Sequence, residues 1–171
     1  RIGRAIGRLS VPLYIDDNSA VTVMEIRAKA RRIVAKHGDI GMIVIDYLQL
    51  MGGNSSAENR QLEVSEISRN LKILARDFKI PVVALSQLSR GIEQRQDKRP
   101  TLSDLRESGA LEQDADVVMF LYRPAVYEDD TQRKADAFLQ VAKHRAGALD
   151  DIRLVFSANY TRFDNFTAKG P

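Results

Sequence analysis

The sequence predicts an α/β fold with a mostly parallel sheet flanked by helices. Short apolar runs at residues 42–50, 82–87 and 117–123 alternate with segments whose apolar residues recur at helical spacing. Strands separated by helices join through parallel crossovers, and the helices then cover both faces of the sheet. Apolar and polar residues alternate along 137–145 and 151–163. That period predicts an antiparallel hairpin at the C-terminal end.

The first elements are marked by their end signals. Residues 11–17, VPLYIDD, are expected to form a short strand that ends at two aspartates. A helix follows, because Thr22 and Glu25 fit a capping box, in which each side chain accepts a hydrogen bond from the other residue's backbone N–H. Gly38 is expected to end this helix. The strand at 42–50 then leads into a loop rich in glycine, serine and asparagine.

A long helix is expected from about residue 60 to residue 79. Its buried face is expected to carry Val64, Ile67, Leu71, Leu74 and Phe78. Pro81 stops it before the strand at 82–87. Residues 88–104 are expected to form a polar loop, with a short helix around 103–113 and an acidic turn at 128–130.

Composition narrows the classes of protein that fit. The chain has 171 residues, 44% of them hydrophobic and 29% charged, which suits one globular domain. No apolar run approaches the roughly 20 residues that a membrane helix needs. Cysteine is absent, which excludes disulfides and fits an intracellular protein. The net charge of +3 is compatible with a nucleic-acid partner without indicating one.

Polar side chains stand at the ends of three expected strands: Asp46, Gln87 and Arg123. Ligands of such sheets bind beyond the carboxyl ends of the strands. A carboxylate there suits a Mg²⁺–phosphate site, although an isolated aspartate after an apolar run fits a solvated strand end equally well. Gln87, one helix further along the chain, favours the phosphate interpretation, because a neutral amide can contact a terminal phosphate.

The usual phosphate cradle, G-x-x-x-x-G-K-[ST], is missing, and no Gly-Lys pair occurs in the chain. Two explanations stay open. Either the cradle lies upstream of Arg1, since a chain that begins with arginine is expected to be a piece of a longer protein, or this is a relative that no longer binds nucleotide.

Two basic segments are candidate phosphate contacts. In the loop at 98–116, Arg106 could meet nucleic-acid phosphates, although its mixed charge favours a solvated loop on composition alone. Lys143 and Arg145 are two residues apart and share one face of a strand. An arginine that completes a neighbour's phosphate site would have this pattern, and so would a cationic strand tip in water.

Four segments together resemble one known family. IVIDYLQLM, PVVALSQLSRGIEQRQDKRPTLSDLRESGALEQDADVVMFLYR, KHRAG and RFDN are similar to the C-terminal motor domain of the DnaB-type hexameric replicative DNA helicases of bacteria, over nearly all 171 residues. The resemblance implies a RecA-like P-loop-type ATPase core in a homo-hexamer around single-stranded DNA. It also implies ATP and Mg²⁺ as cofactors, 5′-to-3′ translocation, and primase and a helicase loader as partners at the replication fork in the cytoplasm.

The resemblance also implies roles for individual residues. Asp46 matches the Walker B aspartate that orders Mg²⁺ through water, and Gln87 matches the sensor glutamine. The family's DNA-binding loop matches at Arg106, Glu107 and Gly109. Lys143 and Arg145 match the basic pair that reaches into the adjacent subunit's ATP site, with Arg145 as the arginine finger. Arg123 is expected to border the nucleotide base.

Departures from the family and two alternatives complete the interpretation. Ala146 and Ala148 stand where the family commonly has asparagine and proline, so the turn after the finger is expected to differ. The phosphate loop, the water-activating glutamate and a primase-docking domain are expected upstream, so residues 1–171 should form a single partial domain without ATPase activity of its own. The alternatives are another RecA-like ATPase, against which SDLRESGALEQDAD argues, and a nucleic-acid-binding module of the same fold without ATPase activity.

Overall fold

The computed structural model describes residues 12–18, 20–52, 57–127 and 134–167, without the side chains of 57–59 and 106–108. In this part of the chain, no helix combines the length and apolar character needed to cross a membrane. The expected acidic turn at 128–130 lies outside it.

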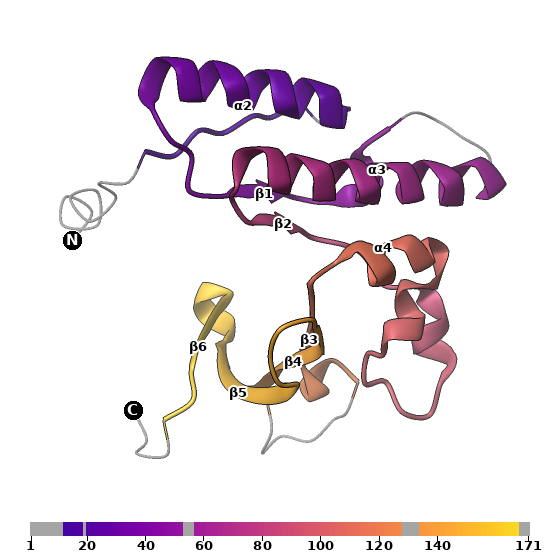
Figure 1. Cartoon of the computed structure of the whole chain (residues 1–171). Coiled ribbons are helices and arrows are strands. Elements are labelled where there is room, and N and C mark those ends of the chain that lie inside the picture. The colour runs from indigo at the N-terminus through magenta and orange to yellow at the C-terminus, as the bar shows by residue number, and fades with distance from the viewer. Residues whose placement is uncertain (1–11, 19, 53–56, 128–133, 168–171) are drawn as a thin grey trace.

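The N-terminal half forms a layer of two helices and a short parallel sheet. Its elements are α2 (Val23–His37), β1 (Ile43–Ile45), the 3₁₀ helix η1 (Leu48–Leu50), α3 (Ala57–Phe78) and β2 (Val82–Ala84). Strand β1 pairs with β2 in parallel, as predicted. Helices α2 and α3 lie on the same side of these strands (Figure 1). The core of this layer consists of Val23, Ile45, Leu48, Met51, Ile67, Leu71 and Leu74.

The predicted helix signals are confirmed. Thr22 and Glu25 form the capping box of α2, in which the Thr22 N–H donates to Glu25 Oε2 at 2.7 Å. Gly38 ends α2 at φ +90°, a conformation that favours glycine. The expected apolar face of α3 is buried at Val64, Ile67, Leu71 and Leu74, while the partly buried Phe78 packs against the same core.

The expected strand at 11–17 is wrong, because residues 12–18 have no regular secondary structure. Side chains hold this exposed segment against α2: Lys29 donates to Asp16, and the Tyr14 and His37 rings lie 5.3 Å apart. Strand β1 is also shorter than the predicted 42–50, because the chain turns into η1 after Asp46.

The C-terminal half forms a four-stranded antiparallel sheet in the order β3-β4-β5-β6. It begins with 3₁₀ helices η2 (Arg90–Gln94) and η3 (Leu102–Ser108), followed by α4 (Gly109–Asp114), so the helix expected at 103–113 is present in two parts. The later elements are β3 (Val117–Tyr122), η4 (Pro124–Val126), β4 (Asp136–His144), β5 (Asp150–Ser157), η6 (Ala158–Tyr160) and β6 (Arg162–Asn165).

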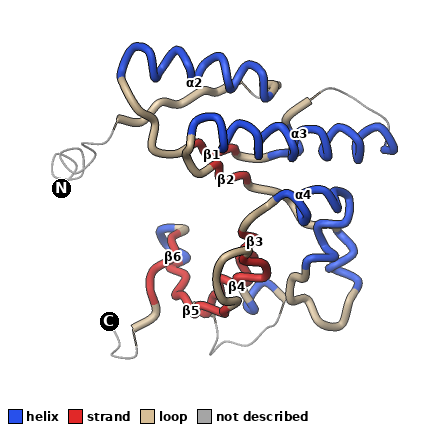
Figure 2. Tube along the Cα trace, in the orientation of Figure 1, coloured by secondary structure: helices blue, strands red, loops and turns tan. Residues whose placement is uncertain are grey.

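Strand β3 was expected to join the parallel sheet, and this expectation is wrong. The strand pairs antiparallel with β4, and neither β3 nor β2 has a second strand partner among the described residues. Figure 2 shows the strands in two separate groups. Val83, Met119 and Leu121 remain exposed on these strands, because no further strand or helix of the described chain covers them. The predicted α/β class is nevertheless confirmed: helices, a parallel sheet and a C-terminal antiparallel sheet are all present.

Candidate nucleotide and DNA site

Asp46 directly follows β1 at the carboxyl edge of the parallel sheet, where its side chain is exposed. It makes no hydrogen bond or ion pair with any described residue. The described residues also contain no group of three or more histidine, aspartate or glutamate side chains that could hold a metal. A single free carboxylate fits Mg²⁺, which keeps several of its waters and takes one or two protein carboxylates.

Gln87 lies at the same edge, three residues after β2. Leu85 bonds Ile45 and Leu48 through its backbone, with the Leu85 N–H donating to the Ile45 carbonyl at 2.9 Å, so the chain after β2 runs beside the chain after β1. Gln87 is exposed, and its side-chain amide has no partner within the described part of the chain. Two of the three groups predicted at this edge, Asp46 and Gln87, are therefore brought together there, and both are available to a ligand.

Gln49 is a polar residue at this edge that the sequence analysis did not single out. Its Nε2 donates to the Gln87 carbonyl at 3.3 Å and to Ser86 Oγ at 3.0 Å, and its Oε1 accepts from the Gln87 N–H at 3.2 Å. The only sequence feature that marks Gln49 is its position between two leucines, Leu48 and Leu50. Because residues 42–50 were predicted to form one strand, this pattern did not indicate a role for the glutamine.

Asp104 organises the segment that leads to the predicted DNA contacts. One carboxylate oxygen accepts from the Thr101 N–H at 2.7 Å, the Thr101 hydroxyl at 3.0 Å and Arg95 Nη2 at 2.9 Å. Burial opposes ionisation of this carboxyl group, but the Thr101 hydrogen bonds and then the Arg95 ion pair outweigh it and lower the pKa of Asp104. The residue is 7% exposed.

The predicted DNA contacts lie at the junction of η3 and α4. The backbone of Arg106 and Glu107 belongs to η3, while their side chains lie outside the described residues. Gly109 starts α4 with ordinary helical angles, φ −51° and ψ −23°. A Cβ added there would meet no atom within 4 Å. The fold therefore does not itself require glycine at this exposed position.

Lys143 and Arg145 stand at the end of β4, next to α4. Lys143 Nζ donates to the backbone carbonyls of Glu112 and Gln113, which lie in the last turn of α4. Arg145 Nη1 lies 3.2 Å from Asp116 Oδ1, and the Arg145 side chain remains 57% exposed. Its guanidinium is thus paired with Asp116 at the surface and is not buried.

Asp116 lies close to several cationic side chains beside Arg145, the expected arginine finger. Lys72 donates to its carboxylate, and the Arg145 N–H donates to its backbone carbonyl at 2.8 Å. The Lys72 hydrogen bond is the largest cause of the lowered pKa of Asp116; burial opposes it, and the charges of Lys72, Arg145 and Lys143 reinforce it. The sequence analysis missed Asp116, because its partners lie 44 and 29 residues away in the chain.

The turn after Arg145 contains the two expected departures, Ala146 and Ala148. The His144 ring nitrogen Nδ1 bonds the Ala148 carbonyl at 3.3 Å, which closes the turn. A Cβ at Gly147 would lie 2.2 Å from the His144 ring. This turn is therefore held by the histidine.

Arg123 is not brought near this cluster. It follows β3, and its guanidinium lies 3.4 Å from the centre of the Phe156 ring. Because Val117 pairs with His144 and Tyr122 with Phe138, Arg123 and Arg145 stand at opposite ends of β3. The strand that Arg123 follows is part of the antiparallel sheet, whereas Asp46 and Gln87 follow the strands of the parallel sheet.

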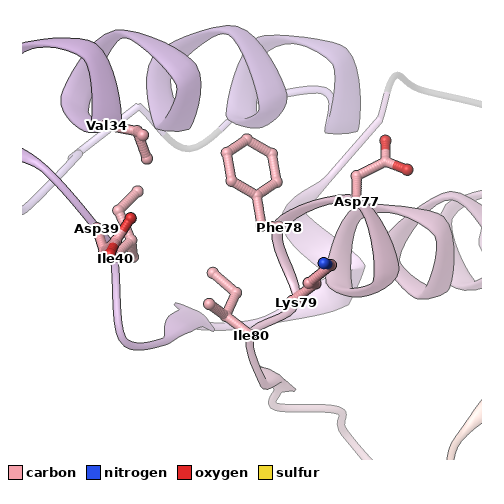
Figure 3. Close-up of a pocket in the computed structure, with 7 residues that line it drawn as sticks. All are labelled: Val34, Asp39, Ile40, Asp77, Phe78, Lys79 and Ile80. Atoms are coloured by element: carbon pink, nitrogen blue, oxygen red, sulfur yellow. The ribbon is translucent and has the colours of Figure 1, made fainter.

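A pocket of about 470 Å³ lies elsewhere, between the ends of α2 and α3 (Figure 3). Ile40 and Ile80, which line it, precede β1 and β2 respectively. The pocket therefore lies toward the amino ends of the two strands, while Asp46 and Gln87 follow their carboxyl ends. It is not part of the candidate site.

The comparison with protein families matches residues 1–165 to the DnaB-like helicase C-terminal domain. Among curated proteins, the replicative DNA helicase DnaB of Geobacillus stearothermophilus is 53% identical over 167 residues. That match covers 96% of this chain and 37% of the relative, so the chain spans little more than a third of the relative's length.

Two solved structures are similar to this one. The first is described as an ATPase domain and superposes with a TM-score of 0.86 at 43% identity, covering 97% of this chain and 59% of that one. The second, a DnaB-like replicative helicase described together with its interactions with primase, has a TM-score of 0.86 and 43% identity, covering 96% of this chain and 40% of the other.

Proposed function

Because this chain belongs to the family of DnaB-like helicase C-terminal domains, we propose that it is part of the motor of a replicative DNA helicase. The intact protein would couple ATP hydrolysis to 5′-to-3′ movement along single-stranded DNA and to duplex unwinding at the replication fork. The observation that carries the proposal is the exposed edge where Asp46 and Gln87 stand together with free side chains. The family match and the named relatives support it.

Within the ATP site, this chain would supply the groups that touch metal and phosphate. Asp46 would hold Mg²⁺ through water, and the metal would neutralise charge on the phosphates. Gln87 would contact the terminal phosphate with its amide. The sequence holds no G-x-x-x-x-G-K-[ST] cradle, so we expect no steady ATP turnover from the purified 171-residue chain.

Arg145 would act as a finger in the ATP site of a neighbouring subunit, with Lys143 beside it, in a homo-hexamer. Its exposed guanidinium lies beside Asp116 and α4. Arg145 follows a strand of the antiparallel sheet, whereas Asp46 and Gln87 follow strands of the parallel sheet. Such a separation suits action across an interface. Removing a finger of this kind costs about 10³–10⁵-fold in turnover in related NTPases.

Mixed rings of the intact helicase test this arrangement. Arg145→Ala and Asp46→Asn should each abolish turnover, while Arg69→Ala, which removes another exposed arginine, should not. When the two inactive variants are mixed in one ring, some sites combine an intact Asp46 with an intact Arg145 from the next subunit, and turnover should return. Wild-type turnover in the Arg145→Ala ring, or inactive rings after verified mixing, would refute the assignment.

Single-stranded DNA would lie against η3 and α4, with Arg106, Glu107 and Gly109 following its backbone. The open space beside Gly109 supports a close approach of DNA at this point. Arg106→Ala should weaken binding for all sequences and reduce the salt slope of the affinity by about one. An unchanged slope in a fluorescence anisotropy titration would count against this contact.

Primase and a helicase loader are the proposed protein partners of the intact helicase at the cytoplasmic replication fork. One similar solved structure is described with its interactions with primase, which supports the first. Co-purification of the intact helicase with purified primase tests it directly.

A second candidate is a nucleic-acid-binding module of the same fold without ATPase activity, favoured by the missing cradle. The two candidates differ in one measurement: the intact helicase should bind ATP, while the module should bind DNA with no affinity for nucleotide.

A further inference from the structure

We propose that Gln49 is a positioning residue that holds the sensor glutamine, Gln87, beside Asp46, and that α3 holds Gln49 through Arg60. The inference rests on the proposed function, because it presumes that Gln87 faces the terminal phosphate of ATP. It adds a residue, and a connection to α3, that the proposed function does not contain.

The side chain of Gln49 continues the contact between two diverging segments. The regular pairing of β1 with β2 ends at Ile45 and Ala84, and Leu85 makes the last backbone bonds across. Beyond that point, Gln49 bonds both the N–H and the carbonyl of Gln87, at 3.2 and 3.3 Å. A primary amide can do this because it carries a donor and an acceptor side by side.

Gln49 thereby orients Gln87 without touching the nucleotide. The side chain of Gln87 has no partner of its own among the described residues, so the direction in which it leaves the chain depends on its backbone. The two hydrogen bonds from Gln49 fix that backbone. Ser86, whose hydroxyl also accepts from Gln49 Nε2 at 3.0 Å, is held by the same amide.

Arg60 of α3 fixes the backbone of the segment that carries Gln49. Its Nη2 donates to the Gln49 carbonyl at 2.7 Å, and its Nη1 donates to the Met51 carbonyl at 3.0 Å and to Glu63 at 2.8 Å. Leu48 and Met51, on either side of Gln49, are each 2% exposed. Gln49 is therefore anchored by core packing and by α3.

Gly52 gives an independent sign of how closely this segment packs on α3. It has φ +88°, and a Cβ there would lie 1.8 Å from Glu63 Oε1. A movement of the first turns of α3 would consequently move the backbone at Gln49, and through its amide the backbone at Gln87. Helix α3 and the sensor are thus mechanically connected at one side chain.

The test uses the intact helicase with Gln49→Met, which keeps the length of the side chain and removes both hydrogen bonds to the Gln87 backbone together with the one to Ser86. We expect kcat for ATP to fall by about 10²-fold, the effect of misplacing a reacting group by about 1 Å, while KM for ATP stays unchanged. Hydrogen exchange at the Gln87 amide should become faster, while exchange in β2 (Val82–Ala84) does not change. Gln61→Met, which replaces an exposed glutamine of α3, is the matched control and should match wild type.

A third variant, Gln87→Met, distinguishes the sensor role of Gln87 from the positioning role of Gln49. If its turnover equals wild type, the sensor role fails and the positioning role fails with it. If Gln87→Met is slow but Gln49→Met has wild-type kcat or wild-type exchange at Gln87, the positioning role is wrong and the proposed function stands. If Gln49→Met raises KM or loosens β2 along with lowering kcat, the residue is merely structural, which also overturns the inference.

Discussion

Replacing Asp104 by alanine should loosen the segment that leads to the proposed DNA contacts, while leaving the proposed nucleotide-binding edge at Asp46 and Gln87 intact. The carboxylate accepts three hydrogen bonds, two from Thr101 and one from Arg95, and its side chain is 8% exposed. The Asp104 carbonyl also accepts from the Ser89 N–H at 2.9 Å, which ties the start of η3 to the chain after Gln87. Asp104 therefore connects several parts of residues 95–108 through hydrogen bonds.

The size of the effect follows from these contacts. Breaking a buried ion pair by removing one partner costs about 3–5 kcal/mol. The Arg95 side chain is 35% exposed and can be hydrated after the change, so the lower end of that range applies. We expect a local destabilisation of about 3 kcal/mol, which raises the population of the opened segment by roughly 10²-fold. Asp104→Asn keeps an oxygen for Thr101 and should have an intermediate effect.

Hydrogen exchange and DNA binding measure the two consequences in the intact helicase. Amides of residues 101–105 should exchange roughly 10²-fold faster in Asp104→Ala, and the affinity for single-stranded DNA should fall, because Arg106 and Gly109 follow directly. Glu93→Ala removes an exposed carboxylate of η2, the element just before this segment, and is the matched control. Exchange within twofold of wild type, together with unchanged DNA affinity, would show that Asp104 does not organise this segment.

Four further outcomes follow from the structure. Folding lowers the pKa of Asp104, so the ionised carboxylate stabilises the folded segment fully above its unfolded pKa of about 3.9. This stabilisation is lost as the pH falls through the lower folded pKa. Hydrogen exchange of residues 101–105, measured as a function of pH, would show the loss. Leu74→Ala, at a fully buried position of α3, should lower the free energy of unfolding by about 2–5 kcal/mol in denaturant titrations, whereas a loss below 1 kcal/mol would contradict the assigned core. Gly52→Ala should destabilise the protein by about 1–3 kcal/mol, since it adds positive-φ strain and a clash with Glu63; a wild-type thermal midpoint would argue against that packing. Gly109→Ala should leave the midpoint unchanged or raise it, because the position is helical and open, yet weaken DNA binding in anisotropy titrations; unaltered affinity would remove Gly109 from the DNA contact.

The edge of the sheet that carries Asp46 and Gln87 shows how much local sequence patterns predict. Asp46 and Gln87 were predicted to share one edge, because both follow apolar runs separated by one helix, and the parallel pairing of β1 with β2 confirms it. That Gln49 bonds Gln87 was not predictable, since the two residues are 38 positions apart and the bond depends on how the chain turns after each strand.

What the sequence by itself determined are the features that depend on near neighbours: the capping box of α2, the buried face of α3 and the presence of a strand before Asp46 and before Gln87. Only the tertiary structure decided that β3 pairs with β4, that residues 12–18 form no strand, and that Asp116 pairs with Arg145. The physical reason is range. Helix caps and periodicity are set within a few residues, whereas strand pairing and side-chain contacts between distant segments depend on what else is present to compete for the same edge or charge.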